Sequence, residues 1–281
     1  ASKAWSKAEM IAPKQFREEI SPYFNANPKK YISALVSEDC WQATPGKVVD
    51  LVRNLGIAAG GTVMEDCRVL EACREGKYTS VLVQTHDKKY VEYRTEHFVN
   101  ALGSGAGKLC DSMGIDAGLY PVRHQAFITR RLPMLGKHGT NLDMLIDRQD
   151  YKGFSAVYGQ QIAYTGQIIG CASPKLDAMR IDKNLKVNTK AFLEIVSEMF
   201  SEWIPDLAGV GIQAVWAGYY TEPRYIVDPE LGLFVGMRGH GFMLSQYIAR
   251  MYVDKLLGRP VPEYFEKLKL NGPGLSEKAF K

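Results

Sequence analysis

Residues 231–257 place the strongest constraint on the fold of this chain. An apolar run, "LGLFVGM", ends at Met237, the turn "RGHG" follows, and "FMLSQYIARMYVDKLL" alternates apolar and polar side chains with helical spacing. The pattern predicts a strand, a tight glycine turn and an amphipathic helix. Backbone amides at such a helix start favour an electron-rich group. We therefore expect the turn to be a binding element; an ordinary structural turn is the alternative.

A second glycine turn, "GSGAG" at residues 103–107, also lies between a strand pattern and a helix pattern. Gly103 and Gly105 match the first two glycines of a GxGxxG dinucleotide fingerprint, but position 108 is Lys108. No Asp or Glu ends a strand about 20 residues later, where a ribose partner belongs. A tight turn with close backbone packing is the simpler interpretation, and no complete fingerprint occurs in the sequence.

The composition is that of an ordinary globular chain. The 281 residues include 35 basic and 31 acidic ones, scattered along the sequence, which argues against a nucleic-acid binder. No apolar run approaches the about 20 residues that a membrane helix requires, and no secretory signal is visible. The cysteines have no CxxC spacing, which predicts free thiols in a reducing, cytoplasmic compartment and no metal site; they are Cys40, Cys67, Cys73, Cys110 and Cys171.

Strand and helix patterns are interleaved along the whole chain. Thr44 and Pro45 predict the start of a helix, and the Gly60–Gly61 pair predicts its end. We expect helices at 8–20, 44–61, 188–207 and 243–257. We expect a meander of strands at 62–73, 78–86 and 89–102. A further strand is expected at 120–133, followed by a β-rich region that extends to about residue 172, and another strand at 211–225. The expected fold class is α/β plus antiparallel β, in two domains with several chain crossings.

Several segments together resemble one enzyme superfamily. "FVNALGSGAG", "YPVRHQAFIT", "IIGCASP", "IPDL", "VWAGYYTEPRY" and "GLFVGMRGHGFMLSQYIARMYVDKLLG" occur in this order. The chain resembles the FAD-dependent oxidoreductases of the D-amino-acid oxidase superfamily. The branch that it resembles most contains sarcosine and dimethylglycine dehydrogenases, glycine oxidase and dye-linked L-proline dehydrogenase. The motifs are specific to the superfamily and to no single substrate.

The resemblance implies a Rossmann-like FAD-binding domain and a mixed-sheet substrate domain. Residues 44–117 and 208–281 correspond to the C-terminal portion of the FAD-binding domain, and residues 8–43 and 118–207 to the substrate domain. Members of the superfamily begin with a βαβ unit that carries GxGxxG, and this sequence has no counterpart of it. We therefore expect an incomplete FAD-binding domain and a second polypeptide that supplies the unit, from a separate gene or a cleaved precursor.

The resemblance also implies the roles of individual residues. Arg238 stands where the superfamily usually has a small residue; it either places a cation beside the flavin or points to solvent. His240 and His124 are expected to be structural. The implied catalytic residues are Tyr220, Tyr219 and Arg224, the last as a carboxylate clamp with Arg123 as the weaker candidate. The implied cofactor-binding residues are Val69, Ala101, Gly103, Gly218, Arg238, Gly239, His240, Gly241, Phe242 and Met243.

Two functions remain open from the sequence. The first is a subunit of an FAD-dependent dehydrogenase or oxidase that oxidises a C–N bond of a small secondary or N-methylated amino acid by hydride transfer to flavin. Its electrons would pass to an acceptor protein or a quinone. The second is a redox-inactive member of the superfamily that serves as a structural or assembly subunit. The intact "GHGFMLS" loop favours the first, and the missing nucleotide unit favours the second.

Overall fold

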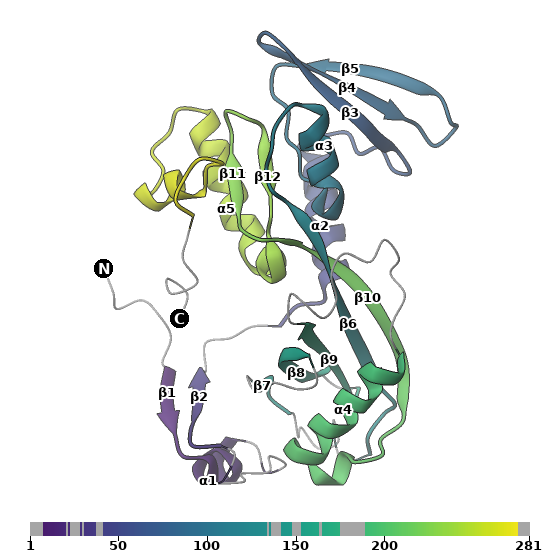
Figure 1. Ribbon diagram of the computed structural model, residues 1–281, viewed down its shortest axis with the longest axis vertical. Helices are drawn as coiled ribbons and strands as arrows, with labels where there is room; N and C mark the ends of the chain where they lie inside the picture. Colours follow the sequence, from purple (N-terminus) through teal and green to yellow (C-terminus); the bar gives the residue numbers. More distant parts are fainter. Residues whose placement is uncertain are drawn as a thin grey trace. The chain divides into compact units, whose positions relative to one another are not determined.

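The structure is a computed structural model that describes residues 8–20, 22, 29, 31–37, 42–133, 135, 142–147, 153–162, 165–174 and 189–274. The chain forms two compact units (Figure 1). Unit 1 comprises Ala1–Gln42 and Arg123–Gly218, and unit 2 comprises Ala43–Val122 and Tyr219–Lys281. Strands β6 (Tyr120–Thr129) and β10 (Ile212–Glu222) each run from one unit into the other. The sequence-based domain boundaries, at 117/118 and 207/208, fall just before these strands.

The N-terminal part of unit 1 differs from the expectation of a helix over residues 8–20. Residues Ala8–Ile11 form strand β1, which pairs antiparallel with β2 (Ala34–Ser37). Helical turns follow in α1 (Pro13–Gln15) and η1 (Phe16–Ile20). The helix prediction is wrong for residues 8–11, because their strand partner lies more than twenty positions away and leaves no trace in the local pattern.

The core of unit 1 lies between a five-stranded sheet and a helix. The strand order is β10-β6-β9-β8-β7, with β7 (Leu145–Asp147), β8 (Phe154–Ile162) and β9 (Gln167–Pro174). The amphipathic helix α4 (Thr189–Trp203) is followed by a short turn, η3 (Pro205–Leu207). Phe192 of α4 is fully buried, with its ring centroid 6.0 Å from that of Phe127 on β6. The expected helix over 188–207 and the β-rich region are therefore both present.

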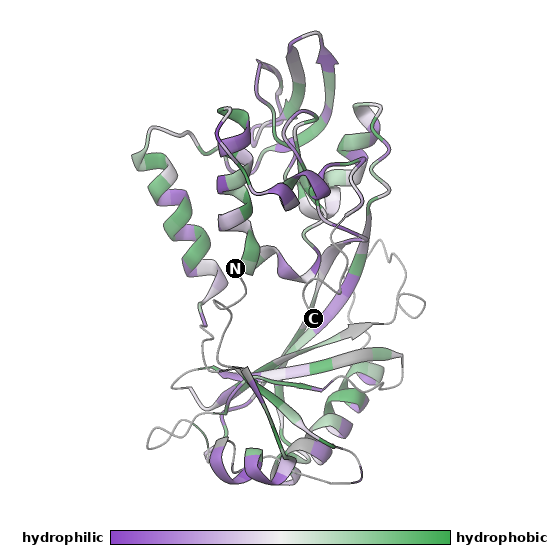
Figure 2. Ribbon diagram, turned by 90° about the vertical axis from the view of Figure 1, so that its left-hand side faces the viewer, coloured by the Kyte–Doolittle hydropathy of each residue, from purple (hydrophilic) through white to green (hydrophobic). Residues whose placement is uncertain are grey.

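Unit 2 contains the predicted meander. Strands β3 (Arg68–Glu75), β4 (Tyr78–Gln84) and β5 (Tyr90–Thr95) form an antiparallel sheet in that order. The meander is preceded by α2 (Pro45–Ala58), for which Thr44 is the N-cap residue and Pro45 the first helical residue, as expected. No side-chain hydrogen bond from Thr44 caps the helix. Helices of both units show alternating hydrophobic and hydrophilic stretches (Figure 2).

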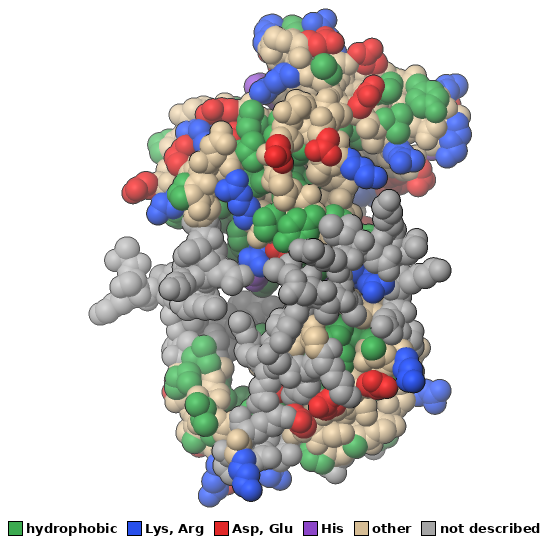
Figure 3. Space-filling view, in the orientation of Figure 1, with side chains coloured by type: hydrophobic (Ala, Val, Ile, Leu, Met, Phe, Trp, Pro, Cys, Tyr) green, Lys and Arg blue, Asp and Glu red, His purple; other side chains and the backbone are tan. Residues whose placement is uncertain are grey.

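The remaining helices and strands of unit 2 pack around two hydrophobic cores. A turn η2 (Gly103–Gly105) leads into α3 (Ala106–Ser112); strands β11 (Ile226–Asp228) and β12 (Leu233–Val235) form a hairpin; and η4 (Arg238–His240) leads into α5 (Gly241–Leu256), followed by η5 (Glu263–Leu268). One core packs α3 against the hairpin, and the other packs α5 against η5. On the face in Figure 3, basic and acidic side chains are interspersed.

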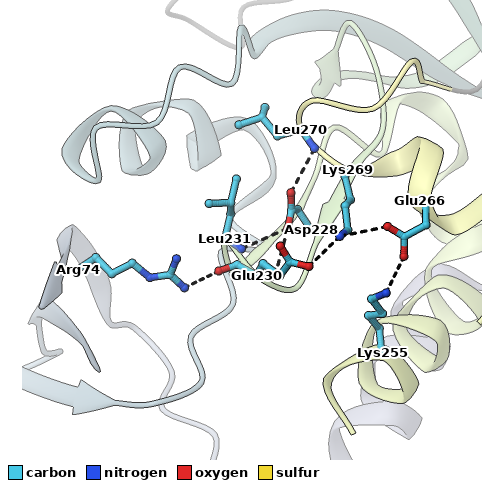
Figure 4. Close-up of polar contacts among 8 residues, drawn as sticks. All are labelled: Arg74, Asp228, Glu230, Leu231, Lys255, Glu266, Lys269 and Leu270. Carbon is cyan, nitrogen blue, oxygen red and sulfur yellow. Dashed lines mark hydrogen bonds and ion pairs between the residues drawn. The ribbon is translucent and has the colours of Figure 1, made fainter. Parts of the chain in front are cut away.

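A polar network ties the C-terminal turn to the β11–β12 hairpin (Figure 4). Asp228 accepts hydrogen bonds from the amides of Glu230, Leu231 and Leu270, at 3.1, 3.2 and 3.3 Å. The Lys269 ammonium lies 2.7 Å from Glu230 and 3.1 Å from Glu266. Lys269 lowers the pKa of the Glu230 carboxyl, and Lys255 together with Lys269 lowers that of Glu266. Two further residues extend the network. Lys255 on α5 donates to the Glu266 carboxylate, and Arg74 on β3 donates to the carbonyl of Glu230.

Candidate functional site

The glycine turn of unit 2 has the geometry that the sequence predicts. Residues 238–240 form the turn η4, and α5 begins at Gly241, two residues before the expected position. The N-cap residue is His240, and no side chain caps the first amides of α5. Amides at the start of a helix carry partial positive charge, equivalent to about half an elementary charge. The start of α5 is therefore suited to an electron-rich ligand.

A cavity of about 240 Å³ lies beside this turn. Its walls come from the loop after Asn100, the end of β10, and β12 with the turn that follows, all within unit 2. The lining residues are Ala101, Gly103, Tyr219, Thr221, Phe234, Val235, Gly236, Met237 and Arg238. A larger hollow of about 620 Å³ opens along one face of α4 and contains none of the predicted site residues.

Glycines permit the close approach of the turn to β10. A Cβ atom added at Gly239 would lie 2.8 Å from Cε2 of Tyr220. Gly236 has φ +71°, and an added Cβ would overlap the carbonyl oxygen of Arg224, so only glycine fits there. Gly241 is less restricted, because its added Cβ would meet only the Met237 side chain, at 3.0 Å. The turn is therefore packed directly against the end of the "VWAGYY" strand.

The Arg238 side chain lines the cavity and is paired with an acidic residue; it does not extend freely into solvent. Its Nε donates a hydrogen bond of 2.6 Å to Oε2 of Glu222 at the end of β10. The side chains are 25% and 11% exposed, so the pair is largely shielded from water. The backbone of Arg238 has φ +48°, an uncommon conformation for a residue with a Cβ. Glu222 therefore fixes a cation on the cavity wall and offsets its charge.

The Asn100 side chain builds the loop on the opposite wall. Asn100 is buried; its Nδ2 donates to the carbonyl of Ala106 at 3.0 Å, and its Oδ1 accepts from the amide of Leu102 at 3.2 Å. These bonds hold the turn in which Gly103 has φ +54°. The sequence interpretation of "GSGAG" as a tight structural turn agrees with this geometry.

Two other predicted residues have partners outside the cavity. Arg224 donates to the carbonyl of Gly272 at 3.0 Å and to that of Leu270, so its guanidinium binds the C-terminal segment. Its role as a carboxylate clamp stays a prediction. His240 Nδ1 lies 2.5 Å from the hydroxyl of Tyr225, an arrangement that orients the N-cap residue of α5.

The cavity brings together Tyr219, Ala101, Gly103 and Arg238 from the predicted set. Tyr220 and Gly239 meet beside it, and Gly241 begins α5. The remaining predicted residues do not line the cavity, and their cofactor roles stay predictions: Val69 packs among the meander residues, Gly218 lies on β10 in unit 1, and Phe242 and Met243 are exposed on α5.

Sequence reasoning missed Glu222, Thr221 and Asn100. Glu222 carried one signal, since it is an acidic residue at the end of an apolar strand, where a charge needs a partner. Asn100 follows an apolar run and precedes a glycine turn, where Asn often bonds to backbone groups. The pairing of Glu222 with Arg238, sixteen positions away, was not visible in the local pattern.

The described residues include neither a metal-binding cluster of three or more His, Cys, Asp or Glu side chains nor a disulfide among Cys67, Cys73, Cys110 and Cys171. Cys40 lies outside the described residues. In the described part of the chain, every helix is too short or too polar to span a lipid bilayer.

Two glycine-containing loops beside one cavity, one of which leads into a helix, are features of α/β proteins that bind nucleotide-like cofactors. Comparison with known families defines the class further. The family described as FAD dependent oxidoreductase (DAO) matches residues 2–255. The chain belongs to this family, as the sequence motifs predicted. No curated protein matches the chain in sequence.

Solved structures share the fold. L-proline dehydrogenase from P. horikoshii is 24% identical, with a TM-score of 0.73 over 94% of this chain and 68% of that chain. Glycine oxidase from Bacillus cereus is 18% identical, with a TM-score of 0.71 over 94% of this chain and 69% of that chain. Glycine oxidase from Geobacillus kaustophilus is 16% identical, with a TM-score of 0.72 over 95% and 67%. The likeness confirms the mixed α/β fold with antiparallel sheets.

FAD is the cofactor of this family, and the residues of unit 2 fit it. The first amides of α5 have no side-chain cap, and Arg238 adds a cation on the same wall. Gly103 lines the cavity without a side chain, and Gly239 lets the turn lie against the Tyr220 ring, which an added Cβ would contact at 2.8 Å. Residues 238–241 would hold an electron-rich edge of the cofactor, and Ala101 with Gly103 would flank it.

Proposed function

We propose that this chain is a subunit of an FAD-dependent dehydrogenase or oxidase that oxidises a C–N bond of a small secondary or N-methylated amino acid. Sarcosine, dimethylglycine and proline represent this substrate class. A partner polypeptide supplies the nucleotide-binding βαβ unit, and the electrons pass to an acceptor protein or a quinone. The enzyme works in a reducing, cytoplasmic compartment, a setting with which the exposed thiol of Cys73 is compatible.

One observation carries this proposal. Arg238, the first residue of the turn that leads into α5, lines one cavity together with the loop at Gly103 and the end of β10, in a chain of the FAD dependent oxidoreductase family. When bound, FAD accepts a hydride from the carbon next to an amine nitrogen. The chain's own groups would supply charge: the amides of α5 and the Arg238 guanidinium favour negative charge that develops on the cofactor edge.

The end of β10 would contact a small substrate in the cavity. Tyr219 lines the cavity, and Tyr220 lies against Gly239, so the two tyrosines alternate along β10. Tyr219 would orient the substrate beside the cavity, and Tyr220 would hold the glycine turn in place. A neutral amine can donate hydride without a general base, so the site requires no strong base. Arg224 would bind a substrate carboxylate only after releasing the carbonyls of Leu270 and Gly272.

Anaerobic mixing of the purified native protein with candidate substrates tests the proposal. Sarcosine, dimethylglycine and L-proline are the substrates, and glycine, a primary amine, is the matched control. We expect bleaching of the flavin absorbance by at least one secondary or N-methylated amino acid, faster than by glycine. Tyr219→Phe should raise KM or lower kcat for the same substrate. A bound flavin that none of these compounds reduces would contradict the proposed substrate class.

The redox-inactive alternative is favoured by one observation, the absence of a GxGxxG spacing in the sequence. A structural or assembly subunit would have no need for flavin. The visible spectrum of the native protein separates the two functions, because only the first predicts a flavin band. A native complex without any flavin would support the structural role.

A further inference from the structure

Thr221 is a buried polar residue on the wall of the cavity in unit 2. The alternation of side chains along β10 places Tyr219 and Thr221 on one face of the strand, and both residues line the cavity. Thr221 is only 6% exposed. Because it lines the cavity, the small part of its surface that remains accessible faces into the cavity. The strand therefore presents Thr221 to a group bound there.

The hydroxyl group of Thr221 has no hydrogen-bond partner in the described part of the chain. Its oxygen is also not one of those that the fold seals completely from solvent. Buried polar groups in folded proteins are almost always hydrogen-bonded, because a buried hydroxyl without a partner is costly. Thr129 on β6 is equally buried, but its hydroxyl accepts from the amide of Ile168 at 2.9 Å. The hydrogen-bonding capacity of Thr221 thus remains for a group in the cavity.

The residues around Thr221 define the chemistry of such a group. Arg238 lines the same cavity, and its guanidinium carries a positive charge and only hydrogen-bond donors, one of which is bonded to Glu222. The Thr221 hydroxyl can donate as well. Phe234 and Met237 add apolar surface to the cavity wall. A ligand that matches these walls has an apolar body and an edge of oxygen acceptors that carries negative charge.

We propose that Thr221 is a ligand-binding residue of this cavity, whose hydroxyl donates a hydrogen bond to the negatively charged oxygen edge that Arg238 also faces. Two groups have this chemistry: the carbonyl-bearing edge of the flavin, which gains negative charge on reduction, and the carboxylate of an amino-acid substrate. The inference rests on the proposed function for the identity of these groups. It assigns a neutral donor whose removal leaves the Arg238–Glu222 pair intact.

Thr221→Val tests the proposal in the native assembly, because valine has nearly the same shape as threonine and lacks the hydroxyl. A redox titration measures the flavin reduction potential. The flavin absorbance reports the dissociation constant of pyrrole-2-carboxylate, an aromatic analogue of proline. Loss of a hydrogen bond to a charged group corresponds to a factor of about ten or more. We expect a potential lower by about 30 mV if the flavin edge is the partner, or a dissociation constant raised about tenfold if the carboxylate is.

Two control variants separate ligand binding from folding. Thr221→Ser keeps the hydroxyl and should keep both values near those of the wild type. Thr79 is a buried threonine on β4 outside the cavity, so Thr79→Val should change neither value. Thr221→Val should not lower the denaturant midpoint of the flavin-free assembly, and Thr221→Ala, whose side chain is smaller, serves where valine prevents assembly. A lower midpoint with unchanged potential and affinity would make Thr221 structural and overturn the proposal.

The role of Thr221 and the proposed function can fail separately. An unchanged potential together with an unchanged dissociation constant in Thr221→Val overturns the role of Thr221, even where sarcosine or L-proline bleaches the flavin. A lowered potential in an assembly whose flavin none of the proposed substrates reduces supports the role of Thr221 and contradicts the substrate class. An assembly that binds neither FAD nor pyrrole-2-carboxylate overturns both.

Discussion

Gly239 is the residue at which the turn and the end of β10 are closest. An alanine there would place Cβ 2.8 Å from the Tyr220 ring, and such overpacking costs about 1–3 kcal/mol. We expect Gly239→Ala to lower the free energy of unfolding by about that amount and to weaken flavin binding, as measured by denaturant unfolding and FAD titration. Gly241→Ala should cost little, because Gly241 has φ −54° and begins a helix.

Tyr220→Ala supplies the control for this prediction. If the Tyr220 ring is the obstacle, Gly239→Ala should cost much less in the Tyr220→Ala background, and the double-mutant cycle should show coupling. Equal losses in both backgrounds would mean that another contact, and not the ring of Tyr220, requires glycine at position 239.

The Arg238–Glu222 pair predicts two opposite shifts of the flavin reduction potential. Arg238→Ser removes a cation from the cavity wall and should lower the potential, whereas Glu222→Gln removes the charge that offsets Arg238 and should raise it. For a two-electron couple, about 30 mV corresponds to about 1.4 kcal/mol. A redox titration of the native assembly measures both variants. Shifts in the same direction, or no shift in either, would exclude the pair from the flavin environment.

At the scale of elements, strand β6 carries a half-buried histidine, His124, that makes folding sensitive to acid. Burial lowers the pKa of His124 from 6.5 to about 4. The unfolded chain then binds a proton that the folded chain does not bind. The contribution of neutral His124 to the free energy of unfolding is therefore complete above pH 6.5 and is lost as the pH falls towards 4. We expect the free energy of unfolding to fall by about 3 kcal/mol over that range from this group.

Unfolding of His124→Gln at several pH values checks the sign. Its stability should depend less on pH between 6.5 and 4 than that of the wild type, while His86→Gln, at an exposed position, should keep the wild-type slope. A wild-type slope in His124→Gln would show that acid destabilises the fold through other groups.

Elements with strong periodicity were predicted well from the sequence. Helices α2, α4 and α5 and strand β4 lie where the apolar spacing places them, whereas β3 begins at Arg68 and not at residue 62. Strand β5 ends at Thr95, and not at residue 102, because Asn100 makes a single parallel bridge with Leu233. The turn at 238–240 and the start of α5 were predicted because their residues are adjacent in sequence, and the binding role of residues 238–241 stays a prediction. The Arg238–Glu222 pair and the Arg224 contacts join segments distant in sequence, which local pattern does not encode.

At the scale of the whole molecule, the units differ in how complete they are. Unit 1 buries Phe127, Phe154 and Phe192 in one continuous core between its sheet and α4. Unit 2 distributes its buried residues over three smaller clusters and leaves the apolar side chains Leu51, Val52 and Leu55 of α2 exposed. Because burial of apolar surface is the main stabilising contribution in folding, we expect unit 2 to depend on an added unit for its stability.

The ratio of FAD to this chain, measured together with the mass of the particle, tests most directly whether a second polypeptide completes the flavin site. Analytical ultracentrifugation with detection at the flavin absorbance gives both quantities for the native protein and for the chain purified alone. We predict that the native assembly contains a second polypeptide and stoichiometric FAD, and that the chain alone aggregates or binds FAD poorly. A soluble monomer of this chain that holds stoichiometric FAD would contradict the proposal.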